Sequence, residues 1–121
     1  AHVYLENDGG QLRLRPLPRM SQIAPIYDWL VEDLDGDGRL DLVAAGNNWD
    51  TEVETPRYDG GRGMILLNHP EGFAVQYHWT DTGLRLHKNL RRLARVWLGE
   101  NWGLLGSNNN DRIQFYPFNR P

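Results

Sequence analysis

One short stretch of the chain, EDLDGDGRLDL at residues 32–42, carries four aspartates: Asp33, Asp35, Asp37 and Asp41. Two carboxylates a few ångströms apart repel each other by about 1 kcal/mol even in bulk water. A bound cation would offset that repulsion, and carboxylate oxygens are the ligands that hard divalent cations prefer. The alternative is a solvated Asp-Gly hairpin turn, although such a turn needs only one Asp-Gly pair.

The aspartate spacing matches the first nine positions of the calcium-loop pattern Asp-x-Asp-x-Asp-Gly. Counted from Asp33, carboxylates stand at positions 1, 3, 5 and 9, Gly38 stands at the sharp turn, and Arg39 can offer its carbonyl. An EF-hand is excluded because position 12 is Ala44 and both flanks resemble strands. Many oxygen ligands on a flexible loop favour calcium over magnesium, and zinc would need His or Cys nearby. The predicted metal ligands are Asp33, Asp35, Asp37, Asp41 and the backbone carbonyl of Arg39.

The elements that must position this loop are strands. Short apolar stretches separated by Gly, Asn, Asp and Pro predict an all-β fold, and no segment combines a helical period with caps at both ends. The strands are expected near residues 2–6, 11–15, 26–33, 40–45, 63–68, 73–79, 91–98, 103–107 and 112–118.

The chain also contains an internal repeat with a spacing of 62 residues. LVAAGNN at 42–48 aligns with LLGSNNN at 104–110, and VYLENDGGQ at 3–11 aligns with ILLNHPEGF at 65–73. We therefore expect one domain, 1–121, made of a first repeat over 1–60 and a second over 61–121. Four short strands per repeat are typical of a propeller blade, so the prediction is about two four-stranded antiparallel blades.

The second repeat lacks the acidic loop, because its corresponding positions are not acidic. We therefore expect one metal site of this kind. The residues 62 positions after the four aspartates are Arg95, Trp97, Gly99 and Gly103.

These motifs resemble a known family. VEDLDGDGRLDLVAAGN resembles the calcium-loop signature of FG-GAP/VCBS-type β-propeller repeats, and RYDGGRGMILLNHPEGF is similar to the carboxy-terminal blades of large bacterial members. The resemblance implies a propeller whose calcium loop joins adjacent strands of a blade. It also implies a secreted or periplasmic bacterial protein with a binding or scaffold role and no catalytic residues. Closed propellers have at least four blades, so we expect a homo-oligomer or neighbouring propeller blades.

The long stretch GNNWDTEVETPRYDGGRG at 46–63 leaves two interpretations open. It could form the rim of a glycan or protein ligand site, which would make the chain a carbohydrate-binding or glycan-processing domain. Alternatively, its arginine anchors the loop and its tyrosine only packs. A third hypothesis is a self-assembling interaction module. The candidate ligand-binding residues of this stretch are Trp49, Glu52, Glu54, Arg57, Tyr58 and Asp59.

Composition argues against several other functions. The net charge of −3 gives no reason to expect nucleic-acid binding, and the absence of cysteine excludes disulfides and thiolate metal sites. No apolar run approaches the roughly 20 residues of a membrane span. No serine or histidine stands in a catalytic motif, so an enzyme is not expected. We expect no signal peptide, and a start at Ala1 is expected of a chain that was processed or cut from a longer one.

Overall fold

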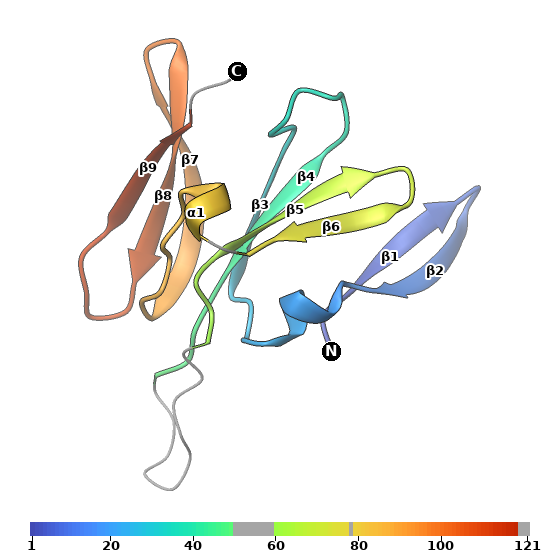
Figure 1. Ribbon diagram of the computed structural model, residues 1–121, viewed down its shortest axis with the longest axis horizontal. Helices are drawn as coiled ribbons and strands as arrows, with labels where there is room; N and C mark the ends of the chain where they lie inside the picture. Colours follow the sequence, from blue (N-terminus) through green and yellow to red (C-terminus); the bar gives the residue numbers. More distant parts are fainter. Residues whose placement is uncertain (50–59, 78, 119–121) are drawn as a thin grey trace, which may run out of the picture.

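The computed structural model describes residues 1–49, 60–77 and 79–118, and it shows an all-β fold of three antiparallel sheets (Figure 1). Each of the nine predicted strands has a counterpart. The strands are β1 (Val3–Asp8), β2 (Gln11–Pro16), β3 (Asp28–Glu32), β4 (Asp41–Ala45), β5 (Met64–His69), β6 (Gly72–Gln76), β7 (Leu90–Leu98), β8 (Asn101–Asn108) and β9 (Gln114–Phe118).

The first sheet is the hairpin β1–β2. Its two-residue turn is Gly9-Gly10, and φ values of 58° and 91° at these positions explain why glycine stands there. Leu5 pairs with Leu14 across the hairpin and Tyr4 pairs with Arg15. Because side chains alternate along a strand, one face of the hairpin is apolar and the other is largely charged.

The second sheet has four strands in the order β3-β4-β5-β6, and the third has three in the order β7-β8-β9. We expected two four-stranded sheets, and the structure has sheets of two, four and three strands instead. The difference arises because strand pairing crosses the repeat boundary at residue 60: β4 of the first repeat pairs with β5 of the second. Before β3, Pro16 and Pro18 lack the N–H that would extend the first sheet.

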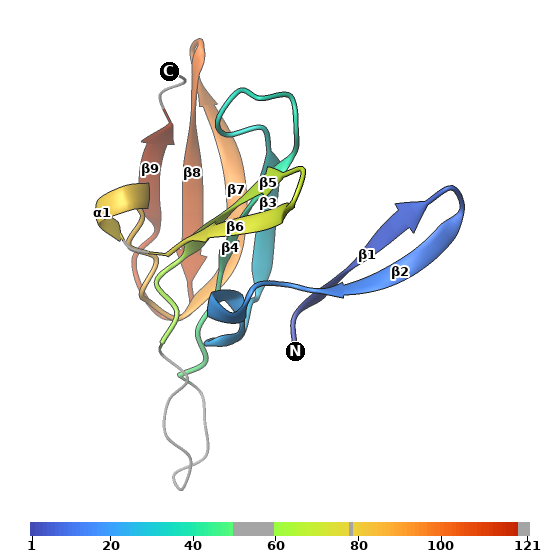
Figure 2. The ribbon, with the colours of Figure 1, turned by 45° about the vertical axis from the view of Figure 1, so that its right-hand side comes forward.

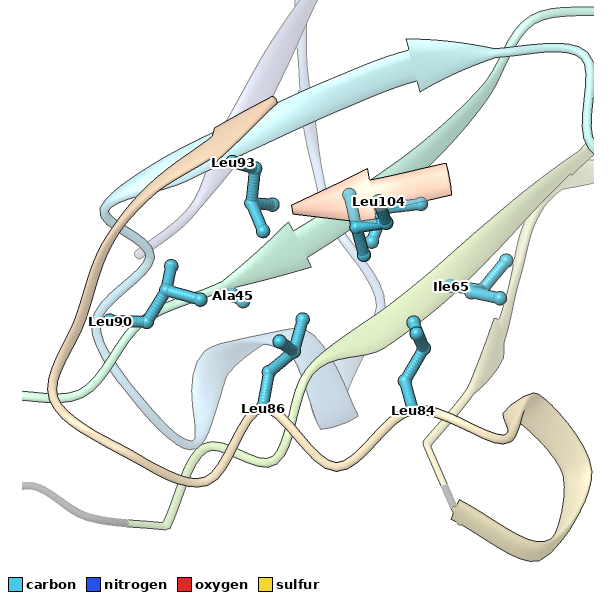
Figure 3. Close-up of a cluster of buried hydrophobic side chains, with 8 residues drawn as sticks. Ala45, Ile65, Leu84, Leu86, Leu90, Leu93 and Leu104 are labelled. Atoms are coloured by element: carbon cyan, nitrogen blue, oxygen red, sulfur yellow. The ribbon is translucent and has the colours of Figure 1, made fainter. Parts of the chain in front are cut away.

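The second sheet lies between the other two and buries side chains on both of its faces (Figure 2). The apolar run LVAA of β4 is typical of a strand buried on both faces, and Val43 and Ala44, which point to opposite faces, are both 0% exposed. The face toward the third sheet forms the larger cluster, shown in Figure 3. That cluster contains Val43, Ala45, Ile65, Leu84, Leu86, Leu90, Leu93 and Leu104.

Polar contacts also join the second and third sheets, where β3 runs beside β7. The Asp28 carboxylate accepts a hydrogen bond from the backbone N–H of Leu93 at 2.8 Å. Further along the same two strands, Arg95 forms an ion pair with Glu32. Apolar packing and these two contacts therefore fix the third sheet on the sheet that carries the Asp-rich loop.

Two short helical turns were not predicted. A 3-10 helix covers Arg19–Gln22, and α1 covers Trp79–Thr82. The strand predicted over 73–79 ends at Gln76 instead, and Gly83, with φ of 71°, follows α1. A four-residue helix is too short to show a 3.6-residue period, so the pattern could not predict it. Within the described ranges, no helix has the length and apolar character needed to cross a membrane.

Candidate metal site

The Asp loop, residues 33–40, connects β3 to β4 at one end of the four-stranded sheet (Figure 1). Carboxylate oxygens of Asp33, Asp35 and Asp37 all lie within 4.8 Å of one another. Asp33 is half-buried and the other two are exposed. Each pair of charges at this separation repels by about 1 kcal/mol in water. The loop therefore gathers anionic oxygens in an arrangement that a cation would stabilise.

Backbone N–H groups hold the three carboxylates in place. Asp33 accepts hydrogen bonds from Gly36 at 2.8 Å and from Gly38 at 3.0 Å, one on each carboxylate oxygen. Asp35 and Asp37 each accept one from the backbone N–H two residues further on, at 3.1 and 2.8 Å. Gly36 and Gly38 have φ of 80° and 87°, values that L side chains rarely adopt. The two glycines therefore allow the chain to turn between successive aspartates.

Arg39 lies at the end of the loop and contacts the acidic group. Its guanidinium is 3.3 Å from the Asp37 carboxylate, and the two side chains are 45% and 30% exposed. An exposed ion pair of this kind contributes about 0–1 kcal/mol, so a divalent cation would displace it easily. The prediction for Arg39 concerned its backbone carbonyl, and that role stays a prediction.

Asp41, the fourth predicted ligand, is not part of the group of three carboxylates. It is 0% exposed, and its two oxygens accept hydrogen bonds from the backbone N–H groups of Leu34 at 2.9 Å and Asn68 at 2.8 Å. Asp41 therefore ties the start of the Asp loop to β5. Each of its oxygens has a second lone pair, so direct ligation of a metal by Asp41 stays a prediction.

The donor set fits calcium better than other cations. Three carboxylates offer up to six hard oxygens, and calcium binds six to eight such ligands in flexible geometry. Oxygens that already accept an N–H keep further lone pairs for a cation. Zinc, copper, iron and nickel prefer imidazole or thiolate ligands, and none of the clustered residues offers either.

Of the second predicted site, Trp49 lies among the described residues. Trp49 is half-buried at the start of the long loop. Glu52, Glu54, Arg57, Tyr58 and Asp59 lie outside the described residues, so the ligand-rim interpretation stays a prediction.

Sequence reasoning missed the residue that joins the two ends of the long loop, Asn47. Its side chain is 0% exposed and bonds Gly61 in both directions, donating to the carbonyl at 2.8 Å and accepting from the N–H at 2.8 Å. The same amide donates to the carbonyl of Lys88 at 3.0 Å, and Arg91 donates to the carbonyl of Asn47 at 2.9 Å. The Asn-Asn pair that occurs in both repeats was the available signal, but asparagine is also typical of ordinary turns.

A groove of about 1010 Å³ opens beside the Asp loop, between the β1–β2 hairpin and the turn after β5. Tyr4 and Phe73 meet edge to face within it, with ring centroids 5.3 Å apart. Charged side chains of both signs line the rest, including the Glu6–Arg15 ion pair at 3.0 Å. Aromatic faces among paired charges could accept a polar, uncharged ligand.

Comparisons of the chain with protein-family models, with curated proteins and with solved structures each found no match. The geometry of the Asp loop and the arrangement of the sheets are therefore the basis for assigning a function.

Proposed function

We propose that the chain is a non-catalytic, calcium-stabilised module of the β-propeller type. It acts as a binding or scaffold element of a secreted bacterial protein. The observation that carries this proposal is the convergence of Asp33, Asp35 and Asp37 within 4.8 Å in a loop between two antiparallel strands. No plain hairpin turn needs three carboxylates at one point.

The arrangement of the sheets supports the propeller part of the proposal. The four strands of the second sheet are neighbours in the same order as in the sequence, as in a propeller blade. The second and third sheets pack against each other through the larger apolar cluster, and Tyr4 of β1 belongs to the smaller cluster on the opposite face of the second sheet. A third sheet of three strands and a hairpin of two would then be parts of the adjacent blades. The resemblance of the Asp loop to FG-GAP/VCBS repeats agrees with this arrangement.

The calcium ion would be structural. Bound by Asp33, Asp35 and Asp37, with the Arg39 carbonyl and Asp41 as the further predicted ligands, it would cancel the repulsion between the carboxylates. The chain itself supplies the rest of the stabilisation, because Asp41 holds the loop against β5 whether or not a metal is present. The groove beside the loop is then the place where the module could hold a polar ligand.

Replacing Asp35 by Asn tests the proposal. Asn keeps the size of the side chain but removes its charge, so calcium affinity should fall by roughly 10- to 100-fold. Titration calorimetry measures this change directly. Asp35 is exposed, so the fold should not change.

The matched control is Glu100→Gln. Glu100 lies in the β7–β8 turn, which corresponds to the Asp loop in the second repeat, and it is also exposed. This variant removes the same charge from a place where no metal is proposed, and its calcium affinity should equal that of the unmodified chain. Equal affinities for all three proteins would contradict the calcium site.

A further inference from the structure

The β1–β2 hairpin presents an apolar face to solvent. Leu5, Leu12 and Leu14 lie on one face and are 60%, 66% and 64% exposed. Figure 2 shows the hairpin extending away from the other sheets. A lone hairpin with its apolar side in water is only marginally stable, and an exposed apolar patch of this kind marks an interaction site. We therefore expect another protein surface to cover this apolar face.

The internal repeat identifies what covers such a face. The two-residue turn between Asp8 and Gln11 corresponds to the turn between His69 and Gly72, which makes β1–β2 equivalent to β5–β6 at a spacing of 61. Leu5, Leu12 and Leu14 then correspond to Leu66, Phe73 and Val75. Leu66 is 0% exposed, and all three belong to the cluster that also contains Tyr4 of the preceding sheet and Leu17, which follows β2. The apolar face of the hairpin is therefore equivalent to a face of β5–β6 that points toward the preceding sheet. We expect a preceding sheet to cover the hairpin face in the same way.

The opposite end of the stack, the β7–β9 sheet, carries a complementary surface. On its outer face Leu105 pairs with Ala94 on one side and Phe115 on the other. In the second sheet the corresponding row, Leu30, Val43 and Ile65, packs against the sheet that follows it. Val43 and Ile65 are 0% and 6% exposed, whereas Phe115 is 41% exposed and Leu98, on the same face of β7 as Ala94, is 56% exposed. The outer face of the β7–β9 sheet therefore corresponds to the face of the second sheet that packs against the next sheet.

We propose that copies of this chain associate head to tail, with the outer face of the β7–β9 sheet of one copy on the apolar hairpin face of the next. The contact repeats the one that the chain already makes between its second and third sheets, so it continues an interface that the fold has established. The two surfaces differ, so the association is heterologous and forms a ring or an open chain of copies. It involves no residue of the Asp loop, so it stands or falls independently of the calcium site.

Three variants and a matched control test the association. Leu12→Lys places a charge in the hairpin face and should weaken association roughly 100-fold, as loss of a central apolar contact does. Gln11→Lys adds the same charge one residue earlier, on the opposite and exposed face, and should associate normally. Phe115→Lys disrupts the other surface. Because Phe115 packs on Gly103, Ile113→Lys at a 62% exposed neighbouring position serves as a second variant of that surface.

The decisive experiment mixes the two kinds of variant. Leu12→Lys alone and Ile113→Lys alone should each be monomeric by light scattering, because each lacks one of the two surfaces. Their mixture should form a one-to-one dimer that cannot extend, since one intact surface of each kind remains. An unmodified chain that stays monomeric at millimolar concentration would overturn the proposal. So would dimers of Ile113→Lys alone, because they would show that hairpin faces pair with each other.

Discussion

Replacing Asn47 by Ala should lower the free energy of unfolding by about 3–5 kcal/mol. The amide makes three hydrogen bonds, two with Gly61 and one with the carbonyl of Lys88. Asn47 is 0% exposed and its two bonds with Gly61 are buried, so Ala removes this partner from the N–H and carbonyl of Gly61 and from the half-buried carbonyl of Lys88. Urea unfolding followed by tryptophan fluorescence measures the loss.

The control for this experiment is Asn101→Ala. Asn101 is exposed at the start of β8, so its removal should change stability by less than about 0.5 kcal/mol. A loss below about 1 kcal/mol for Asn47→Ala would contradict the role given to Asn47. The long loop would then be held by other contacts.

Replacing Asp41 by Asn should cost about 2–4 kcal/mol already in EDTA, where Asp41 acts only as an anchor, and any additional cost in calcium would measure its predicted ligation of the metal. Each Asp41 oxygen accepts one backbone N–H, from Leu34 or from Asn68, and Asn has only one oxygen. The side-chain NH₂ group of the variant would therefore face one of these two backbone N–H groups, and two donors would meet inside the protein. Loss of a charge-assisted hydrogen bond lowers the stability further. Thermal unfolding in both buffers measures the effect.

Asp37→Asn separates anchoring from ligation. Asp37 is exposed, and its removal relieves repulsion within the cluster, so the variant should be about as stable as the unmodified chain in EDTA. In calcium it should lose stability, because the ion loses a ligand. If Asp41→Asn followed this pattern instead and lost stability only in calcium, Asp41 would be a metal ligand and not an anchor.

Local signals in the sequence predicted the strands well. The Gly9-Gly10 turn, the apolar run of β4 and the alternation in β7 all depend on residues close together in the chain. The convergence of Asp33, Asp35 and Asp37 was predictable for the same reason, because alternate residues of one tight loop lie close together in space. These features need no knowledge of the rest of the fold.

The partners of each strand could not be predicted in the same way. Aligning the glycines Gly10 and Gly72 gave a spacing of 62, whereas the hairpin register gives 61. A shift of one residue exchanges the two faces of a strand, so the alignment matched Leu5 with Leu67 and not with Leu66. The grouping of strands into sheets, the anchoring by Asp41 and the role of Asn47 all depend on contacts between distant segments, which periodicity does not report.

The measurement that tests the central claim most directly is thermal unfolding in excess EDTA and then in millimolar calcium, with magnesium as the control ion. At 100 times its dissociation constant, calcium should add about 2.7 kcal/mol of stability, or roughly 10 °C in Tm for a chain of this size. The account predicts a shift of that order with calcium, a much smaller one with magnesium, and a reduced one for Asp35→Asn. The same Tm in EDTA and in calcium would contradict it and leave the Asp loop as a solvated turn.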